Sequence, residues 1–150
     1  MKEIQLTQGK IALVDDEDYD FLNQFKWHYS NGYASKSHGK RPNRKKLTMH
    51  TLLLGAKEGF MIDHKNRNTL DNQKENLRHV TNSQNQMNAK KSKKNGVSLS
   101  QYKGVTVNKP FRATIGRKTI GYFDTELEAA QAYDKFAKAL YGEFANLNFK

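Results

Sequence analysis

Cysteine is absent from the 150 residues of this sequence. Its absence excludes disulfide bonds and zinc sites built on thiolates, so oxygen atoms or imidazole nitrogens would have to hold any metal ion. Such ligands favour magnesium or manganese over structural zinc. A chain without cysteine also fits the reducing conditions of a cytoplasm.

Long apolar runs are also absent. The N-terminal stretch MKEIQLTQGKIALVDDEDYD contains neither the apolar core of a signal peptide nor a membrane span, so we expect a cytoplasmic protein that contacts no membrane. Only 36% of the residues are hydrophobic, and 150 residues can hold one ordinary domain or two small ones. We expect two small domains, each with a thin core.

Acidic residues are the minority among the charged ones. There are 15 of them against 26 lysines and arginines, which gives a formal net charge of +11. The charge is clustered, because basic residues concentrate in 36–46 and 90–94 while acids concentrate in 15–20. A clustered positive field attracts polyanions and releases their counterions, so nucleic acid is the expected partner.

Short apolar runs and turn signals predict a β-rich N-terminal region. We expect a hairpin, an amphipathic helix with an acidic start, and a second hairpin around Asn31-Gly32. Alternation of apolar and polar residues favours core positions for Trp27, Tyr29 and Tyr33, and the alternative is that these rings stack on bases. In chain order the predicted elements are 3–6 with 11–14, then 15–25, then 26–30 with 33–37.

Residues 37–46 lack apolar periodicity and are predicted to form an exposed basic loop. Its cations either contact DNA phosphates or are merely solvated, and the sequence leaves both interpretations open. The next run, 47–54, is predicted to pass from a strand into one helical turn. His50 lies in this apolar run, which favours a packed or supporting histidine over a catalytic one. The loop cations that are candidates for DNA contact are Arg41, Arg44, Lys45 and Lys46.

One polar stretch, MIDHKNRNTLDNQKENLRHVTNSQN at 61–85, places Asp63 directly before His64. A carboxylate offers a divalent cation a hard oxygen ligand, and the neighbouring imidazole offers a water molecule a base near neutral pH. These two groups are the minimum equipment for metal-assisted hydrolysis of a phosphodiester. The stretch is predicted to fold as strand, loop, strand and helix, with Thr81 capping the helix and Asn85 about one turn inside it.

Two segments resemble the HNH, or ββα-metal, endonuclease family: MHTLLLG and, after it, IDHKNRNTLDNQKENLRHVTNSQN. The resemblance is to the branch of free-standing and intron-encoded homing endonucleases associated with phage. The resemblance covers 1–89. It implies that Asp63 and Asn85 hold one divalent ion, magnesium or manganese, and that His64 is the general base. Asn76 would tie the loop back and orient the histidine. An asparagine at the last position of the motif, in place of a histidine, implies a loosely held ion.

Residues 90–99 are polar and basic and are predicted to form a linker. The linker is either a charged tether along DNA or a solvated connector. Beyond it the sequence predicts three antiparallel strands, at 102–107, 111–115 and 118–123, and then a helix. A capping box begins that helix, and a glycine ends it. The linker cations that are candidates for DNA contact are Lys90, Lys91, Lys93 and Lys94.

Within 100–150, the segments YKGV, IGYFDTELEAAQAYD and YGEFANLNF resemble the Apetala/ethylene-response-factor DNA-binding domain. In that family the uncovered face of the sheet enters the major groove, and strand alternation places Arg112 and Thr114 on that face here. The plant factors mostly carry arginine or tryptophan where this chain has neutral residues, so their target sequence does not transfer. The residues expected to contact DNA are Lys103, Arg112, Thr114, Arg117 and Thr119.

Together these patterns predict an α+β protein. A β-rich HNH nuclease domain at 1–89 is followed by the basic linker at 90–99 and by a three-stranded antiparallel sheet packed on one α-helix at 100–150. We expect a metal-dependent homing endonuclease that nicks or cleaves double-stranded DNA, with the C-terminal sheet selecting the site. The alternative is a DNA-binding regulator with an inactive nuclease domain, against which the joint presence of Asp63, His64 and Asn85 argues. RNA binding is disfavoured by the likeness to a duplex reader, and a monomer is expected.

Overall fold

The computed structural model describes residues 1–39, 43, 45–89, 100–107 and 109–149. Within them the chain forms small antiparallel sheets and four α-helices, so the predicted mixture of α and β structure is confirmed. The chain divides into two compact units, Met1–Asn82 and Ser83–Lys150. In these described ranges no helix is long and apolar enough to cross a membrane.

The first unit begins with a two-stranded antiparallel hairpin, as its apolar runs predict. Strand β1 (Lys2–Gln5) pairs with strand β2 (Ile11–Val14). Helix α1 (Asp16–Leu22) follows, and three acids in its first turn suit the positive end of the helix dipole. The helix ends at Leu22, earlier than the predicted end at residue 25, and its last residue is fully buried.

A second hairpin extends into a three-stranded sheet of order β3-β4-β5. Asn31 and Gly32 make the turn between the first two strands with φ of 51° and 90°, the left-handed backbone that an Asn-Gly hairpin turn requires. The three strands are β3 (His28–Ser30), β4 (Tyr33–His38) and β5 (Lys45–Thr48).

The prediction of a loop from 37 to 46 was wrong at both of its ends. Ser37 pairs with Lys46 and His38 pairs with Lys45, so these four residues belong to the ladder between β4 and β5. Backbone hydrogen bonds to β4 stabilise the edge strand β5, although its residues show no apolar periodicity. A prediction from periodicity therefore misses this strand.

The core of the first unit gathers side chains from the hairpin, α1, the sheet and helix α2 (Met49–Leu54). Trp27 is 5% exposed, and its indole N–H donates to the carbonyl of Leu22 at 2.8 Å. Tyr29 packs against the same cluster, so the core positions predicted for these two aromatic residues are confirmed. The buried members of the cluster are Ile4, Leu6, Ala12, Val14, Leu22, Trp27, Ala34 and Met49.

Strands β6 (Met61–His64) and β7 (Leu77–Val80) form a separate antiparallel pair, joined by a long polar loop. Helix α3 (Asn82–Asn88) follows β7, so strand, loop, strand and helix occur in the predicted order. The division between the two units falls just inside the start of α3, whereas the sequence places the domain boundary after it, at residue 89.

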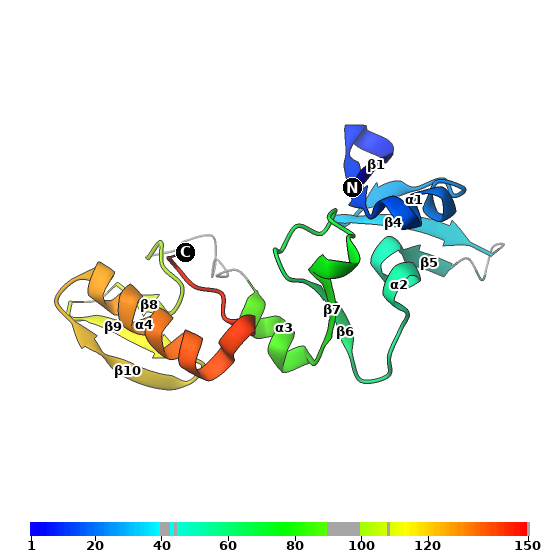
Figure 1. Ribbon diagram of the computed structural model, residues 1–150. Helices are drawn as coiled ribbons and strands as arrows, with labels where there is room; N and C mark the ends of the chain where they lie inside the picture. Colours follow the sequence, from blue (N-terminus) through cyan, green and yellow to red (C-terminus); the bar gives the residue numbers. More distant parts are fainter. Residues whose placement is uncertain (40–42, 44, 90–99, 108, 150) are drawn as a thin grey trace. The chain divides into compact units, whose positions relative to one another are not determined.

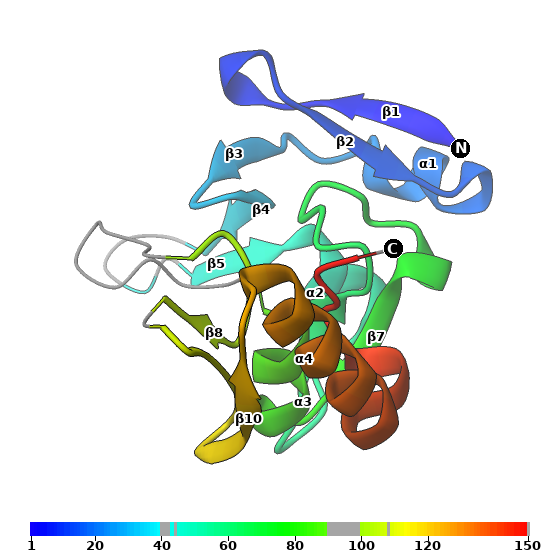
Figure 2. The same cartoon turned by 90° about the vertical axis from the view of Figure 1, so that its left-hand side faces the viewer.

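The second unit is a three-stranded antiparallel sheet of order β10-β9-β8 crossed by one long helix, α4 (Glu126–Tyr141), as Figures 1 and 2 show. Thr125 and Glu128 form the predicted capping box at its start. Alanines of the helix, among them Ala129 and Ala130, are fully buried against the sheet, so the backbone can approach closely. The strands are β8 (Val105–Thr106), β9 (Phe111–Ile115) and β10 (Lys118–Phe123).

Candidate active site

Asp63 and His64 are the last two residues of β6, and both are buried, at 7% and 4% exposed. The pairing of β6 with β7 sets Asp63 opposite Arg78 and His64 opposite Leu77. Successive side chains of a strand point to opposite faces, so the carboxylate and the imidazole have different neighbours although they are adjacent in sequence.

The Asp63 carboxylate forms a buried ion pair with Arg78. The guanidinium Nε and Nη2 both donate to Asp63 Oδ2, at 3.1 and 3.0 Å. The two side chains are 12% exposed for Arg78 and 8% for Asp63, so little water screens the pair. Two bonds to one oxygen fix the direction of the carboxylate.

The His64 ring lies against two other aromatic rings. Its centroid is 5.1 Å from that of His50, with an interplanar angle of 88°, and 6.2 Å from that of Tyr33. The rings of Tyr33 and His50 are 5.2 Å apart. We call Tyr33, His50 and His64 the ring cluster. Its members come from β4, α2 and β6, which are distant in sequence.

Burial controls the charge of both histidines of the ring cluster. It lowers the pKa of His64 below its ordinary value, while the Asn72 amide and the carboxylates of Asp63 and Asp71 act in the opposite direction. Burial also lowers the pKa of His50 to about 4, with a smaller contribution from His64. Both rings are therefore neutral near neutral pH, and a neutral imidazole is the form that a general base requires.

Asn76 ties the long polar loop together, as predicted for its backbone hydrogen bonds. Its Oδ1 accepts the backbone N–H of Asn66 at 3.0 Å, and its Nδ2 donates to the carbonyl of Asp71 at 2.8 Å. The backbone N–H of Lys65 donates to the Asn76 carbonyl at 2.9 Å, which closes the loop at its ends. A single asparagine, 9% exposed, thus links both sides of the loop that follows His64.

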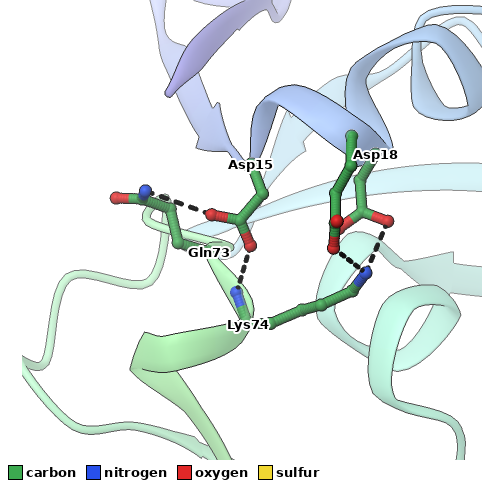
Figure 3. Close-up of polar contacts among 5 residues, drawn as sticks. Asp15, Asp18, Gln73 and Lys74 are labelled. Carbon is green, nitrogen blue, oxygen red and sulfur yellow. Dashed lines mark hydrogen bonds and ion pairs between the residues drawn. The ribbon is translucent and has the colours of Figure 1, made fainter.

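Asp15 and the first turn of helix α1 bind the same loop through the contacts that Figure 3 displays. Asp15 Oδ2 accepts the backbone N–H of Lys74 at 2.8 Å, and Asp15 Oδ1 accepts from Gln73 Nε2 at 3.2 Å. The Lys74 ammonium pairs with Glu17 at 2.7 Å and with Asp18 at 2.9 Å. Hydrogen bonds to these two carboxylates raise the pKa of Lys74. The acids at the start of α1 therefore position the loop in addition to suiting the helix dipole.

Tyr33 and His50 are the functional candidates that sequence reasoning missed or underrated. The prediction that Tyr33 lies in the core was wrong, because Tyr33 is half-buried and its ring contacts the two histidines. His50 was interpreted as a packed or supporting residue, and it is packed directly against His64. No local pattern in the sequence encodes contacts between three separate elements.

Comparison with known proteins identifies the family of this chain. The HNH endonuclease family matches residues 54–87, a range that includes Asp63, His64, Asn76 and Asn85. An uncharacterized HNH endonuclease of Acanthamoeba polyphaga mimivirus is 31% identical, over 94% of this chain and 76% of the relative. This chain belongs to the HNH endonuclease family. No solved structure matches the endonuclease significantly.

HNH endonucleases generally use a divalent metal ion. The residues near His64 are suited to an ion that is held by few protein ligands. In the described part of the endonuclease no group of three or more histidines and acids could form a closed metal cage. Asp63 supplies one hard oxygen donor, and a magnesium-like ion that keeps several waters needs few protein oxygens. Asn85 lies in α3, and its role as a second ligand stays a prediction.

The uncovered sheet face of the second unit carries several of the residues predicted to contact DNA. Thr114 pairs with Thr119, and Arg112 pairs with both Thr106 and Tyr122. Directly opposed residues of an antiparallel sheet point to the same side. Arg112 and Thr119 are exposed, and so is Arg117 in the turn between β9 and β10.

Tyr122, which is 64% exposed, belongs to this face although the sequence did not predict it. The pairing of β10 with β9 shifts by one residue between Thr119 and Gly121. This bulge brings Tyr122 to the side of Thr119 and Arg112, whereas strict alternation would direct it away from Thr119. Alternation alone therefore could not identify the residue.

Lys103 has a structural role besides the predicted DNA contact. Its Nζ donates to the carbonyls of Met87 at 2.8 Å and Ala89 at 2.7 Å, at the C-terminal end of α3. Asn146 Nδ2 also donates to the Ala89 carbonyl, at 3.0 Å. A cation at this end suits the helix dipole, so DNA would have to compete with the helix for the ammonium.

The predicted basic contacts of the loop and linker have different outcomes. Lys45 and Lys46 lie in β5, and Lys46 Nζ donates to Ser30 Oγ at 3.0 Å. The remaining six lie outside the described residues, so their contact with DNA stays a prediction: Arg41, Arg44, Lys90, Lys91, Lys93 and Lys94.

Proposed function

We propose that this endonuclease hydrolyses phosphodiester bonds of double-stranded DNA with the help of a divalent ion, using His64 as the general base. The observation that carries the proposal is that a buried carboxylate and a buried imidazole are consecutive residues at the end of β6, each held by its own neighbours. The loop after this pair is held by Asn76 on one side and by Asp15 on the other.

In the proposed reaction His64 takes a proton from a water molecule, whose oxygen attacks the scissile phosphorus. The bond from phosphorus to the 3′ oxygen breaks, and that oxygen leaves with the electron pair and is protonated from solvent. The ring cluster and the Asn76 loop keep the imidazole in place during the transfer, because a general base must lie within hydrogen-bond reach of the proton it removes.

Asp63 and Asn85 are the proposed ligands of the ion, and Arg78 orients the Asp63 carboxylate through Oδ2. When bound, a magnesium or manganese ion would supply positive charge to the phosphate and to the leaving oxygen. The family pattern is the support for Asn85. Its amide oxygen is a neutral donor, so Asp63 would be the one charged ligand of the pair, which favours an easily exchanged ion.

The second unit is the proposed DNA reader, in the manner of the Apetala/ethylene-response-factor domain. Its support is the exposed face of β9 and β10, where Arg112 lies beside Tyr122 and near the hydroxyls of Thr114 and Thr119. Linking a weakly specific nuclease to a separate reader raises the effective concentration of the nuclease at the target. A homing role in a mobile element, of phage or another virus, fits this division, since the curated relative is itself viral.

Incubation with supercoiled plasmid tests the catalytic part of the proposal. The wild-type protein is expected to nick or linearise the plasmid with magnesium or manganese and to stop when a chelator is added. His64→Ala and Asp63→Ala should each lower the rate by about 100-fold or more, the usual contribution of a general base or ligand. His79→Ala and Asp20→Ala are matched controls, because these residues lie outside the candidate site.

Either of two results contradicts the catalytic proposal. One is the absence of cleavage by wild-type protein with every divalent ion tried, which would favour a DNA-binding regulator. The other is cleavage by the two site variants at the rate of their matched controls.

A further inference from the structure

The ring cluster extends the candidate site beyond the part of the chain that matches the family. Tyr33 and His50 both precede residue 54, where the match begins, yet their rings lie against His64. The contacts have centroid separations of 5.1 to 6.2 Å, within the range in which aromatic rings attract one another. The two contacts of His50 are edge to face, and that of Tyr33 with His64 is tilted at 41°. The two rings therefore restrict the orientations that the His64 imidazole can adopt.

His50 is itself held firmly. Its Nε2 lies 3.0 Å from the hydroxyl of Thr48, which lies 2.7 Å from the hydroxyl of Thr51. Met49, its neighbour in sequence, is fully buried in the core of the first unit. The His50 ring is fixed by a hydrogen bond at Nε2, and its backbone is fixed by the neighbouring core residue. It can therefore pack rigidly against the His64 ring.

His50 contacts His64 through its ring. Its other nitrogen, Nδ1, is buried and has no hydrogen-bond partner among the described residues. The contact between His50 and His64 is one of ring against ring, so ring packing is the contribution to the site that this geometry supports.

We propose that His50, supported by Tyr33, is a positioning residue that holds the His64 ring in the orientation from which it accepts the proton of the attacking water. The inference rests on the proposed function of His64 as the base. It assigns the effect to the ring of residue 50 and not to its nitrogens. A small misplacement of a catalytic group lowers the rate of the chemical step without necessarily weakening substrate binding.

Three substitutions of His50 separate the ring from its hydrogen bonds. His50→Ala removes both, and the expected result is a kcat lowered roughly 10- to 100-fold with the KM for plasmid unchanged. His50→Gln retains an amide for Thr48 without a ring and should resemble the alanine variant. His50→Phe retains a ring and should restore most of the wild-type kcat. His79→Ala is the matched control, because His79 bonds to the carbonyl of Gly55 and lies outside the ring cluster.

Tyr33 offers a second route to the same test if His50→Ala folds poorly, because it lies in β4 and not in α2. Tyr33→Phe should cut as the wild type does, since the ring is kept. Tyr33→Ala should lower kcat and leave KM unchanged.

NMR of the His64 Cε1–Hε1 pair tests the positioning independently of cleavage. The signal should shift and broaden in His50→Ala and stay near its wild-type position in His50→Phe. If the wild type fails to cut DNA, the proposed function falls while this readout still judges the ring cluster. The positioning role is overturned if His50→Ala and Tyr33→Ala keep the wild-type kcat and His64 signal. It is also overturned if His50→Phe is as slow as His50→Ala, because a ring nitrogen would then be the active group.

Discussion

The candidate sites of the two units are held in place by different kinds of contact. In the first, hydrogen bonds and ion pairs join segments that are far apart in sequence, as between Asp15 and Lys74 or between Leu13 and Leu70. In the second, a capping box starts one long helix whose alanines pack on three consecutive strands. The comparison teaches that the loop of the candidate catalytic site is held by a polar network, whereas the sheet of the candidate DNA reader is held by the close apolar packing of one helix.

The largest expected effect comes from breaking the buried ion pair of the first unit. Arg78→Ala leaves the Asp63 carboxylate buried without its guanidinium, and the free energy of unfolding should fall by about 3–5 kcal/mol. Arg112→Ala is the matched control in the second unit, where the exposed side chain should change stability little. Urea unfolding of both variants measures these free energies of unfolding. An equal loss in Arg78→Ala and Arg112→Ala would contradict the expected difference.

Close packing in the second unit is tested at Gly104, which has φ +77° and lies against Tyr133. A Cβ at this position would meet the Tyr133 ring and lie 2.7 Å from the Thr114 carbonyl. Gly104→Ala should therefore lower the free energy of unfolding by about 3 kcal/mol, combining overpacking with backbone strain. Gly116→Ala has the same kind of strain at φ +59° but open space around the Cβ, so it should cost only about 1 kcal/mol. Thermal unfolding that ranks the two alike would show that packing at Gly104 is loose.

The link between α1 and the site loop should have a smaller effect. Asp15→Ala removes the acceptor for the Lys74 N–H and for the Gln73 amide, and stability should fall by about 1–2 kcal/mol. Asp20→Ala, in α1, is the control, since Asp20 is exposed. Hydrogen exchange should also become faster at residues 73–76 in the Asp15 variant, and unchanged exchange there would reject the positioning role of α1.

A dependence of stability on pH is also expected through His50. Burial lowers its pKa from 6.5 to about 4 in the folded protein, so between these values the unfolded chain binds protons more readily. The contribution of the neutral ring is complete above pH 6.5 and is lost as the pH falls toward 4. Chemical unfolding across this window should show a smaller loss in His50→Phe than in the wild type, and equal losses would contradict the assignment.

Local signals in the sequence were sufficient for most elements. The Asn31-Gly32 turn, the Thr125 capping box and the order of β6, β7 and α3 all follow from chemistry within a few residues. The position of Asp63 next to His64 at the end of a strand could be predicted for the same reason. Such features depend on backbone preferences that neighbouring residues determine.

Contacts between distant segments could not be predicted in this way. The pairing of Asp63 with Arg78 depends on the register of β6 against β7, and the ring cluster depends on three elements meeting. Tyr122 lies on the same face of the sheet as Arg112 and Thr119 because of the bulge in β10. In each case the decisive factor is tertiary packing, which a single sequence does not display.

The most direct test of the central claim, that the site at Asp63 and His64 cuts and the sheet of the second unit binds, compares two variants on one duplex. For each, the affinity and the single-turnover cleavage rate at saturating protein are measured together. His64→Ala should bind as the wild type does and cleave about 100-fold more slowly or worse. Arg112→Ala combined with Arg117→Ala should bind more weakly, with a shallower salt dependence, and cleave at the wild-type rate once saturated. A wild-type cleavage rate in the first variant, or wild-type affinity in the second, would contradict the account.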